Sequence, residues 1–269
     1  MFMTRLFSGV LLLVIIIGAI FAGEEVVLLL SAVLSIIGLY ELYRTYNIQR
    51  SILGIVGYFA SIIYILLIWK DVPQAEILGI CTAFLLFMTI YVFTFPKYNI
   101  SEMVFALFGI LYVPLMMMHL YQIRRLSSGI YVIFLVFISA WGNDTFAYCV
   151  GMLIGKHKMA PRLSPKKSVE GAIGGIVGAV IIGAIYGYFI GEQLVLFTFP
   201  VLKCAIICGV CSLIAIIGDL SASAIKRNQN IKDFGDLIPG HGGVLDRFDS
   251  ILLTAPAVYF LVIYLGKLS

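Results

Sequence analysis

Long apolar runs, separated by short polar breaks, cover almost the whole of this 269-residue chain. Each run holds about 20 mainly apolar residues, which is the length that an α-helix needs to cross a bilayer. The breaks at 23–25 and 191–193 are so short that they predict tight hairpins between neighbouring helices. The pattern therefore predicts an all-α, polytopic integral membrane protein with about nine transmembrane helices. The expected helices cover residues 6–22, 26–43, 53–69, 76–95, 103–121, 129–154, 171–190, 194–220 and 250–266.

Composition supports the same class, because 62% of the residues are hydrophobic and only 12% are charged. Soluble domains carry about 25% charged residues. The apolar runs leave no length for a separate soluble domain. No basic surface interleaved with aromatic residues is found outside the loops, so the sequence gives no reason to expect nucleic acid as a partner.

Lys and Arg residues concentrate in the loops that follow the second, fourth, sixth and eighth apolar runs. Cytoplasmic loops of membrane proteins carry an excess of these residues. We therefore expect a multi-pass protein of the cell membrane in which the N-terminus and the long basic loops 155–170 and 221–249 are cytoplasmic. The C-terminus is then expected outside. Arg124 and Arg125 fall on the outer side and are the exception to this bias.

The sixth apolar run contains an ionisable residue, Asp144, directly after Asn143. A charged side chain at the centre of a bilayer costs at least ~2.5 kcal/mol. Asp144 is therefore expected to face a wet cavity, a metal or a cation, with a hydrogen bond between helices as the structural alternative. For Asn143, a structural and a functional role are equally open.

The loop at 155–170 is basic and contains two prolines. A basic cytoplasmic loop attracts anionic lipid headgroups. Lys166 and Lys167 also lie just before the seventh apolar run, where free N–H groups at a helix start favour anionic oxygens. The loop therefore has two compatible interpretations, a lipid-attracting surface and a phosphate-binding surface.

The seventh apolar run is rich in glycine, with spacings of four such as 171/175 and 183/187. Small residues at this spacing let helix backbones approach closely in membranes. We assign these glycines to helix packing rather than to catalysis. The same faces could also serve a homodimer.

The stretch 219–249 contains five of the seven Asp residues of the chain together with four Lys or Arg residues. Carboxylates beside fixed cations are suited to holding a divalent metal together with a polyphosphate. The glycine-rich segment 239–243 predicts sharp backbone turns and lets a ligand approach the main chain. Asp246 and Asp249 follow at a spacing of three, so a helix beginning there would carry both carboxylates on one face.

Three motifs in this stretch resemble the signature of the phosphatidate cytidylyltransferase family, also called CDP-diacylglycerol synthases. They are SxxKR from Ser223, KDxG from Lys232 and PGHGGxxDRxD from Pro239. The upstream sequence SPKKSxEGxxGG from Ser164 is similar to a second block of the same family. The resemblance covers residues 144–249, and the earlier helices match the family only in being hydrophobic.

The resemblance implies transfer of the cytidylyl group of CTP to phosphatidic acid, which yields CDP-diacylglycerol and pyrophosphate for phospholipid biosynthesis. It further implies Mg²⁺ as a cofactor, with room for a second metal ion. The active site is expected at the cytoplasmic boundary, where soluble CTP meets a substrate that cannot leave the bilayer. The chain then divides into N-terminal membrane helices at 1–125 and a catalytic membrane region at 126–269.

In this interpretation, carboxylates bind the metal and cations hold the phosphates. The expected metal ligands are Asp144, Asp219, Asp246 and Asp249. The expected catalytic residues are Asp246, Asp249, Asp219, Lys226, Arg227, His241 and Arg247. The expected contacts to the phosphates of CTP and phosphatidate are Lys166, Lys167, Ser223, Lys226, Arg227, Lys232, Gly242, Gly243 and Arg247.

Three residues of this stretch keep more than one role open. His241 could contact a phosphate, act as an acid toward the leaving group, or only satisfy backbone groups of the loop. Asp233 is more readily explained by an ion pair with Lys232 or Arg227. Asp236 is more readily explained by capping or solvating the loop.

Two other classes of protein compete with this interpretation. CDP-alcohol phosphotransferases also use clustered Asp residues on membrane helices, but the downstream Asp pair of their D-G-x2-A-R-x8-G-x3-D-x3-D run is missing after Asp246. An ion-coupled transporter or channel could use Asp144 and Asp219 as ion sites. Transport is disfavoured because the polar residues gather in two cytoplasmic loops rather than across the membrane midplane, and because no internal repeat is evident.

Overall fold

The computed structural model describes residues 2–240 and 242–267, with side chains described from Phe7 onward. The described chain is mostly helical, and two short strands pair in an antiparallel hairpin. The first helices are α1 (Phe2–Ala22), α2 (Glu24–Thr45), α3 (Ile52–Trp69), α4 (Ala75–Thr94), α5 (Ile100–Tyr112), α6 (Pro114–Met117) and α7 (His119–Arg124). They are followed by α8 (Gly129–Phe137), the π-helical turn η1 (Ile138–Gly142), α9 (Asn143–Ile154), β1 (Lys158–Ala160), β2 (Ser164–Ser168), α10 (Val169–Ile190), the 3₁₀ turn η2 (Gly191–Gln193), α11 (Pro200–Asn228) and α12 (Leu245–Lys267).

This architecture confirms the predicted all-α, polytopic membrane fold. In the part of the chain that the structure describes, eight helical segments are long and apolar enough to cross a membrane. Three of them are composite, because Ile100–Arg124 contains α5 to α7, Gly129–Ile154 contains α8, η1 and α9, and Val169–Gln193 contains α10 and η2. The first predicted helix corresponds to α1. The part of α1 with described side chains, Phe7–Ala22, is apolar but shorter than any of these eight segments.

The chain forms two compact units. The first comprises Met1–Met118 and Gln229–Arg247, and the second comprises His119–Asn228 and Phe248–Ser269. The sequence analysis drew its boundary after residue 125, between N-terminal helices and a catalytic region. The observed units instead divide at Met118, and the glycine-rich segment belongs to the first of them.

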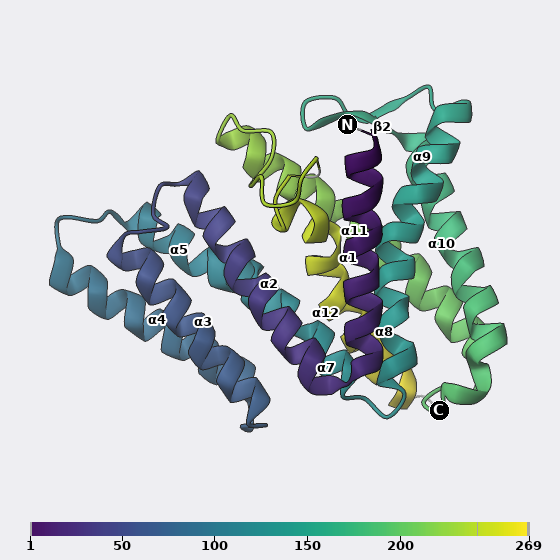
Figure 1. Cartoon of the computed structure of the whole chain (residues 1–269), viewed down its shortest axis with the longest axis horizontal. Coiled ribbons are helices and arrows are strands. Elements are labelled where there is room, and N and C mark those ends of the chain that lie inside the picture. Colours follow the sequence, from purple (N-terminus) through teal and green to yellow (C-terminus); the bar gives the residue numbers. More distant parts are fainter. Residues whose placement is uncertain (1, 241, 268–269) are drawn as a thin grey trace. The chain divides into compact units, whose positions relative to one another are not determined.

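In the first unit, α2, α3 and α5 pack around the fully buried ring of Tyr43. Its hydroxyl donates a hydrogen bond of 2.5 Å to the carbonyl oxygen of Ala106 on α5. Gly57 of α3 and Gly109 of α5 lie directly against the ring. The neighbouring helices α3 and α4 run side by side (Figure 1). This core therefore depends on an aromatic ring that glycines on two neighbouring helices accommodate.

In the second unit, α10 packs against both α9 and α11 (Figure 1). Gly175 and Gly178 face α9, whereas Gly183 and Gly187 face α11. A Cβ atom added at Gly178 would enter the ring of Phe146 on α9. The assignment of these glycines to close helix packing is confirmed, because no side chain fits at these four positions without a shift of the neighbouring helix.

Helix α11 begins and ends later than the apolar pattern predicts. It starts at Pro200 rather than at residue 194, because proline suits the first helical turn and disfavours helix in the residue before it. It then continues to Asn228, so Lys226 and Arg227 lie on the helix rather than in a loop. The apolar pattern detects the membrane part of a helix but not its polar extension.

The closeness of α10 and α11 predicts a specific sensitivity to added volume at Gly187. A Cβ atom there would lie 2.6 Å from the carbonyl oxygen of Pro200, which is backbone and cannot rotate away. We expect Gly187→Ala to destabilise the detergent-solubilised protein by about 1–3 kcal/mol, the usual range for overpacking. Thermal unfolding followed by size-exclusion chromatography measures the effect.

Gly18→Ala in α1 is the matched control, because a Cβ atom at this position meets no atom within 4 Å. It should melt at the wild-type temperature or slightly above it, since alanine favours helix more than glycine does. Equal melting of the Gly187→Ala variant and the wild type would contradict the close packing of the two helices.

Candidate functional site

A pocket of about 510 Å³ opens in the second unit between α9, α10, α11 and the β1–β2 hairpin. Four of the residues that the sequence analysis selected line it, namely Asp144, Lys166, Lys167 and Asp219. The remaining walls are largely apolar. Their lining residues include Ala147, Tyr148, Gly151, Met152, Met159, Ala172 and Ile216. The pocket therefore combines three lysines, the predicted Lys166 and Lys167 together with Lys158, and two carboxylates with an apolar surface.

The β1–β2 hairpin positions the two lysines, and the apolar pattern did not predict this hairpin. Its strands pair with Lys158 opposite Ser168 and Ala160 opposite Ser164. The register of the pairing shifts between Lys158 and Ala160. Ser168 then caps α10, because its hydroxyl accepts the N–H of Gly171 at 3.1 Å. Lys166 and Lys167 consequently lie directly before the start of a helix, where an anionic ligand is favoured.

Glu170, in the first turn of α10, ties the two ends of this hairpin together. Its carboxylate accepts the backbone N–H groups of Lys156 and His157, at 3.1 and 3.2 Å. The Nδ1 atom of His157 also lies 2.5 Å from the same carboxylate. These contacts fix the base of the basic loop over the end of α9.

A π-helical turn precedes Asn143 and Asp144. Such turns are rare and are frequently found at functional sites. Asp144 is exposed and lines the pocket, as expected for a carboxylate that faces a cavity. Asn143 is only 1% exposed, and its Oδ1 atom has no hydrogen-bond partner among the described residues and lies against Gly175 of α10. The structure thus places Asn143 in the wall of the pocket.

Lys167 and Asp219 form an ion pair across the pocket. Both side chains are about one-quarter exposed, at 26% and 24%, so water screens the pair only in part. The hydroxyl of Ser223, one turn further along α11, lies 3.5 Å from Asp219 Oδ1. The ion pair connects the basic hairpin to α11. Lys166, the residue before Lys167, also lines the pocket.

Asp249 is partly buried on α12 and interacts electrostatically with Asp219, Lys226 and Asp144. Helices α11 and α12 approach closely here, because a Cβ atom at Gly218 would lie 2.9 Å from the backbone oxygen of Asp249. Lys226 is 9% exposed and supplies positive charge among these carboxylates. The second unit therefore brings together three of the four predicted metal ligands and three predicted phosphate-binding cations, Lys166, Lys167 and Lys226.

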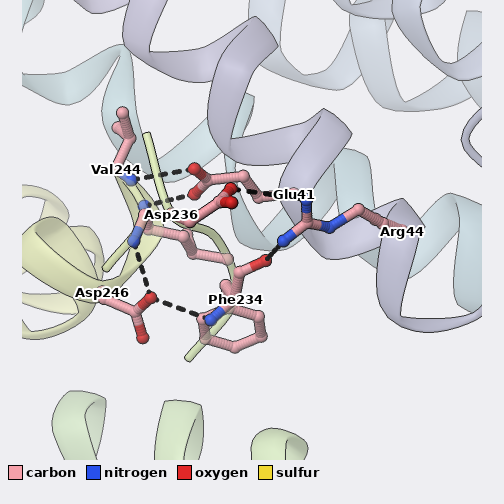
Figure 2. Close-up of polar contacts among 8 residues, drawn as sticks. Glu41, Arg44, Phe234, Asp236, Val244 and Asp246 are labelled. Atoms are coloured by element: carbon pink, nitrogen blue, oxygen red, sulfur yellow. Dashed lines mark hydrogen bonds and ion pairs between the residues drawn. The ribbon is translucent and has the colours of Figure 1, made fainter. Parts of the chain in front are cut away.

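The fourth predicted ligand, Asp246, lies in the first turn of α12 and is 6% exposed. Its Oδ2 atom accepts the N–H of Phe234 at 2.8 Å and the N–H of Gly243 at 3.0 Å, as Figure 2 shows. Gly240 and Gly242 have positive φ angles of 76° and 84°, so the predicted sharp turns are confirmed. Asp246 therefore binds backbone N–H groups within and before the glycine-rich segment. The sequence analysis did not predict this structural role.

Two residues of α2, Glu41 and Arg44, bind the backbone on either side of the glycine-rich segment, and the sequence analysis missed both. Glu41 accepts the N–H groups of Val244 and Leu245 at 3.0 and 2.8 Å. The guanidinium of Arg44 donates to the carbonyl oxygen of Phe234 at 3.0 Å (Figure 2). We call Glu41 and Arg44 the α2 clamp. A buried acid in an apolar run was the available signal, the same one that drew attention to Asp144.

The remaining predicted residues occupy varied environments. Arg227 and Lys232 are exposed, and Arg247 is partly buried with no hydrogen-bond partner for its Nε atom among the described residues. Asp233 is exposed, and the exposed Asp236 lies 3.7 Å from the guanidinium of Arg44. Predictions for His241 concern a residue that lies outside the described part of the chain.

The donor atoms of the second unit fit the expected magnesium ion in type. In the described chain, no group of three or more His, Cys, Asp or Glu side chains is arranged to hold a metal ion by itself. Mg²⁺ rarely uses such an all-protein cage, and one or two carboxylates together with substrate phosphates and waters usually bind it. The carboxylates of Asp144, Asp219 and Asp249 are oxygen donors of the kind it prefers. They suit an ion that binds together with a nucleotide.

These features define a class of protein. A polytopic helical membrane protein with lysines and carboxylates around one partly apolar pocket is suited to an anionic, phosphate-bearing ligand. The family model described as the cytidylyltransferase family matches residues 3–265. The chain therefore belongs to the cytidylyltransferase family.

Similar proteins match along almost their entire lengths. A phosphatidate cytidylyltransferase of Staphylococcus saprophyticus is 30% identical, with 96% of this chain and 98% of that protein covered. The protein of the same name from Bacillus subtilis is 32% identical, with 96% of each chain covered. That of Staphylococcus aureus is 31% identical over 96% of this chain and 98% of the relative. The resemblance inferred from residues 144–249 thus extends to the N-terminal helices.

The ion pair of Lys167 with Asp219 predicts a non-additive effect on stability. Lys167→Met should destabilise the protein, because it leaves a partly buried carboxylate near Asp144 and Asp249 without its cation. We expect a coupling energy of about 1–3 kcal/mol, between the values for exposed and buried pairs. Adding Asp219→Asn should restore part of the lost stability.

Thermal unfolding of the two single variants and the double variant measures this coupling. Simple addition of the two single effects would show that the pair contributes nothing. A raised ionic strength should reduce the coupling only slightly, since both side chains are mostly shielded from solvent.

Proposed function

We propose that the chain is a phosphatidate cytidylyltransferase, which uses CTP and phosphatidate to form CDP-diacylglycerol and pyrophosphate. The observation that carries the proposal is the pocket of the second unit, in which Lys166 and Lys167 line the same walls as Asp144 and Asp219. Support also comes from relatives of this name that align over almost the whole chain. No observation favours a phosphotransferase that consumes CDP-diacylglycerol or an ion-coupled transporter.

The proposed reaction exchanges one phosphate bond for another. An oxygen of the phosphatidate phosphate attacks the α-phosphorus of CTP and forms a new P–O bond. The bond from that phosphorus to the oxygen bridging to the β-phosphate breaks, and pyrophosphate leaves with the electron pair. A phosphomonoester is already anionic near neutral pH, so no dedicated general base is required. The protein must instead position two anions and offset their charge.

The cations of the site are suited to this task. We assign Lys166 and Lys167 to a substrate phosphate at the pocket, where the start of α10 adds a favourable dipole. Lys226 lies beside Asp249 and offsets the mutual repulsion of the carboxylates there. Further groups proposed for the phosphates of CTP are Ser223, Arg227, Lys232 and Arg247, with Gly242 and His241 of the glycine-rich segment. Gly243 was also predicted as a phosphate contact, but its N–H donates to Asp246, so we do not assign it that role.

We propose Mg²⁺ as the cofactor, with a second ion as an option. Asp144, Asp219 and Asp249 would hold it together with the nucleotide, and Asp246 stays a ligand predicted from sequence. When bound, Mg²⁺ neutralises charge on the transferring phosphate and on the leaving pyrophosphate.

A turnover assay tests the proposed function. Purified protein in detergent or liposomes receives radiolabelled CTP, phosphatidate and Mg²⁺, and lipid-extractable label is counted. We expect label that depends on phosphatidate and on Mg²⁺, and we expect Asp219→Asn to lower the rate by at least about 100-fold. The physical reason is that the variant loses both an oxygen donor and the partner of Lys167.

Asp71→Asn is the matched control, because this residue lies in an exposed turn before α4 and does not line the pocket. It should keep wild-type activity. Absence of lipid-linked label with folded wild-type protein would refute the proposal, and consumption of CDP-diacylglycerol would then be measured in its place.

The proposed orientation predicts opposite accessibility of two loops. We place the N-terminus and the loop 155–170 in the cytoplasm, where CTP is found, and the loop before α8 outside the cell membrane. After replacement of the five native cysteines, Ser127→Cys should react with a membrane-impermeant thiol reagent in intact cells. Lys156→Cys should react only after permeabilisation. The reverse pattern would show that the orientation is inverted.

A further inference from the structure

The α2 clamp contains an acid that the proposed chemistry does not use. Glu41 lies inside an apolar helix and is only 4% exposed. Its Oε1 and Oε2 atoms each accept one backbone N–H, from Val244 and Leu245 respectively. These are the residue before α12 and its first residue, whose N–H groups have no partner within the helix. A carboxylate is favourable at this place because the helix dipole and charge-assisted hydrogen bonds both stabilise it.

Two glycines of the family signature fit closely around this carboxylate. A Cβ atom at Gly243 would lie 2.5 Å from both oxygens of Glu41, and a Cβ atom at Gly235 would collide with Oε1. Neither oxygen can move away without losing its hydrogen bond. Gly235 of the KDxG motif and Gly243, the last glycine of PGHGG, therefore have a structural requirement that originates in α2.

Glu41 and Asp246 hold the same piece of chain from two directions. Glu41 binds the N–H groups of Val244 and Leu245, while Asp246 binds those of Gly243 and Phe234. Figure 2 shows the two carboxylates on either side of this backbone. The two acids also interact electrostatically, and their repulsion has to be offset by these hydrogen bonds. Loss of one set of bonds would therefore change the position of the other acid.

Two further contacts support the segment from outside. Arg44 donates to the carbonyl oxygen of Phe234, and its guanidinium lies near Asp236. The hydroxyl of Ser8 on α1 donates to the carbonyl oxygen of Pro239 at 3.2 Å. The N-terminal helices thus anchor the backbone between Phe234 and Leu245 at several points.

We propose that Glu41 is a positioning residue for cytidylyl transfer. It fixes the segment 234–245 and thereby the orientation of Asp246, without touching a substrate. The inference rests on the proposed function, because Asp246 belongs to the site assigned to that reaction. Since the amides of Val244 and Leu245 are committed to Glu41, the phosphates are held by side-chain cations rather than by the start of α12.

The variant Glu41→Gln tests the inference with little change in shape. Its NH₂ group cannot accept a hydrogen bond, so one of the two backbone amides loses its acceptor. We expect kcat to fall by about tenfold or more, the usual consequence of a small misplacement at a reactive site, with the KM for phosphatidate unchanged. Hydrogen–deuterium exchange should accelerate over 233–247 and stay at the wild-type rate in α10 and α11.

Glu192→Gln is the matched control, because Glu192 is exposed in the η2 turn and takes no part in the proposed site. It should match the wild type in both measurements. Arg44→Gln provides a second variant in case Glu41→Gln does not fold. It removes the donor to Phe234 and should show the same local exchange with a smaller loss of kcat.

The outcomes separate positioning from general stability. Local exchange with a reduced kcat supports the inference. Unchanged kcat, a reduced kcat without faster exchange at 233–247, or faster exchange throughout the protein would each overturn it. If the wild type and the Glu192→Gln control form no CDP-diacylglycerol, the proposed function fails. The exchange comparison then decides by itself whether Glu41 holds the segment.

Discussion

A polar group that enters the hydrocarbon of a bilayer must find its partner inside the protein, and the arrangement of this chain follows from that constraint. Glu41 is satisfied by the start of α12. Lys203 is 7% exposed on α11 and donates at 2.8 Å to the carbonyl oxygen of Leu265 near the end of α12, where the helix dipole favours a cation. Asp219 is paired with Lys167. Each of these three charges thus also binds a distant part of the chain.

Much of the fold follows from the sequence, because an apolar run of membrane length has few alternatives to a helix. The pocket was partly predictable as well. Asp144 was selected because an acid in an apolar run needs a polar surrounding, and Lys166 and Lys167 because they precede a helix start. The structure places these residues around one cavity with Asp219.

The remaining features could not be predicted from periodicity. Glu41 meets the α12 start across about 200 residues of sequence, and no local pattern encodes such a contact. The π-helical turn before Asn143 lies inside one long apolar run, and five residues are too few for their periodicity to distinguish it from an α-helix. The polar end of α11 and the short β1–β2 hairpin lack an apolar signal altogether. In each case the feature depends on which residues contact or pair with each other, and the distribution of apolar residues along the chain does not contain this information.

Helix α10 contributes backbone rather than bulky side chains to the pocket, through Gly171 and Ala172. A Cβ atom at Gly171 would lie 2.7 Å from the carbonyl oxygen of Ala147, so this wall has a fixed position. The wall formed by α9 is different, because Tyr148 and Met152 are each 67% exposed and line the same cavity. An enzyme engineer who wished to change the range of accepted ligands would therefore vary α9 and leave α10 untouched. The glycine helix acts as a fixed template against which only the facing side chains can be resized.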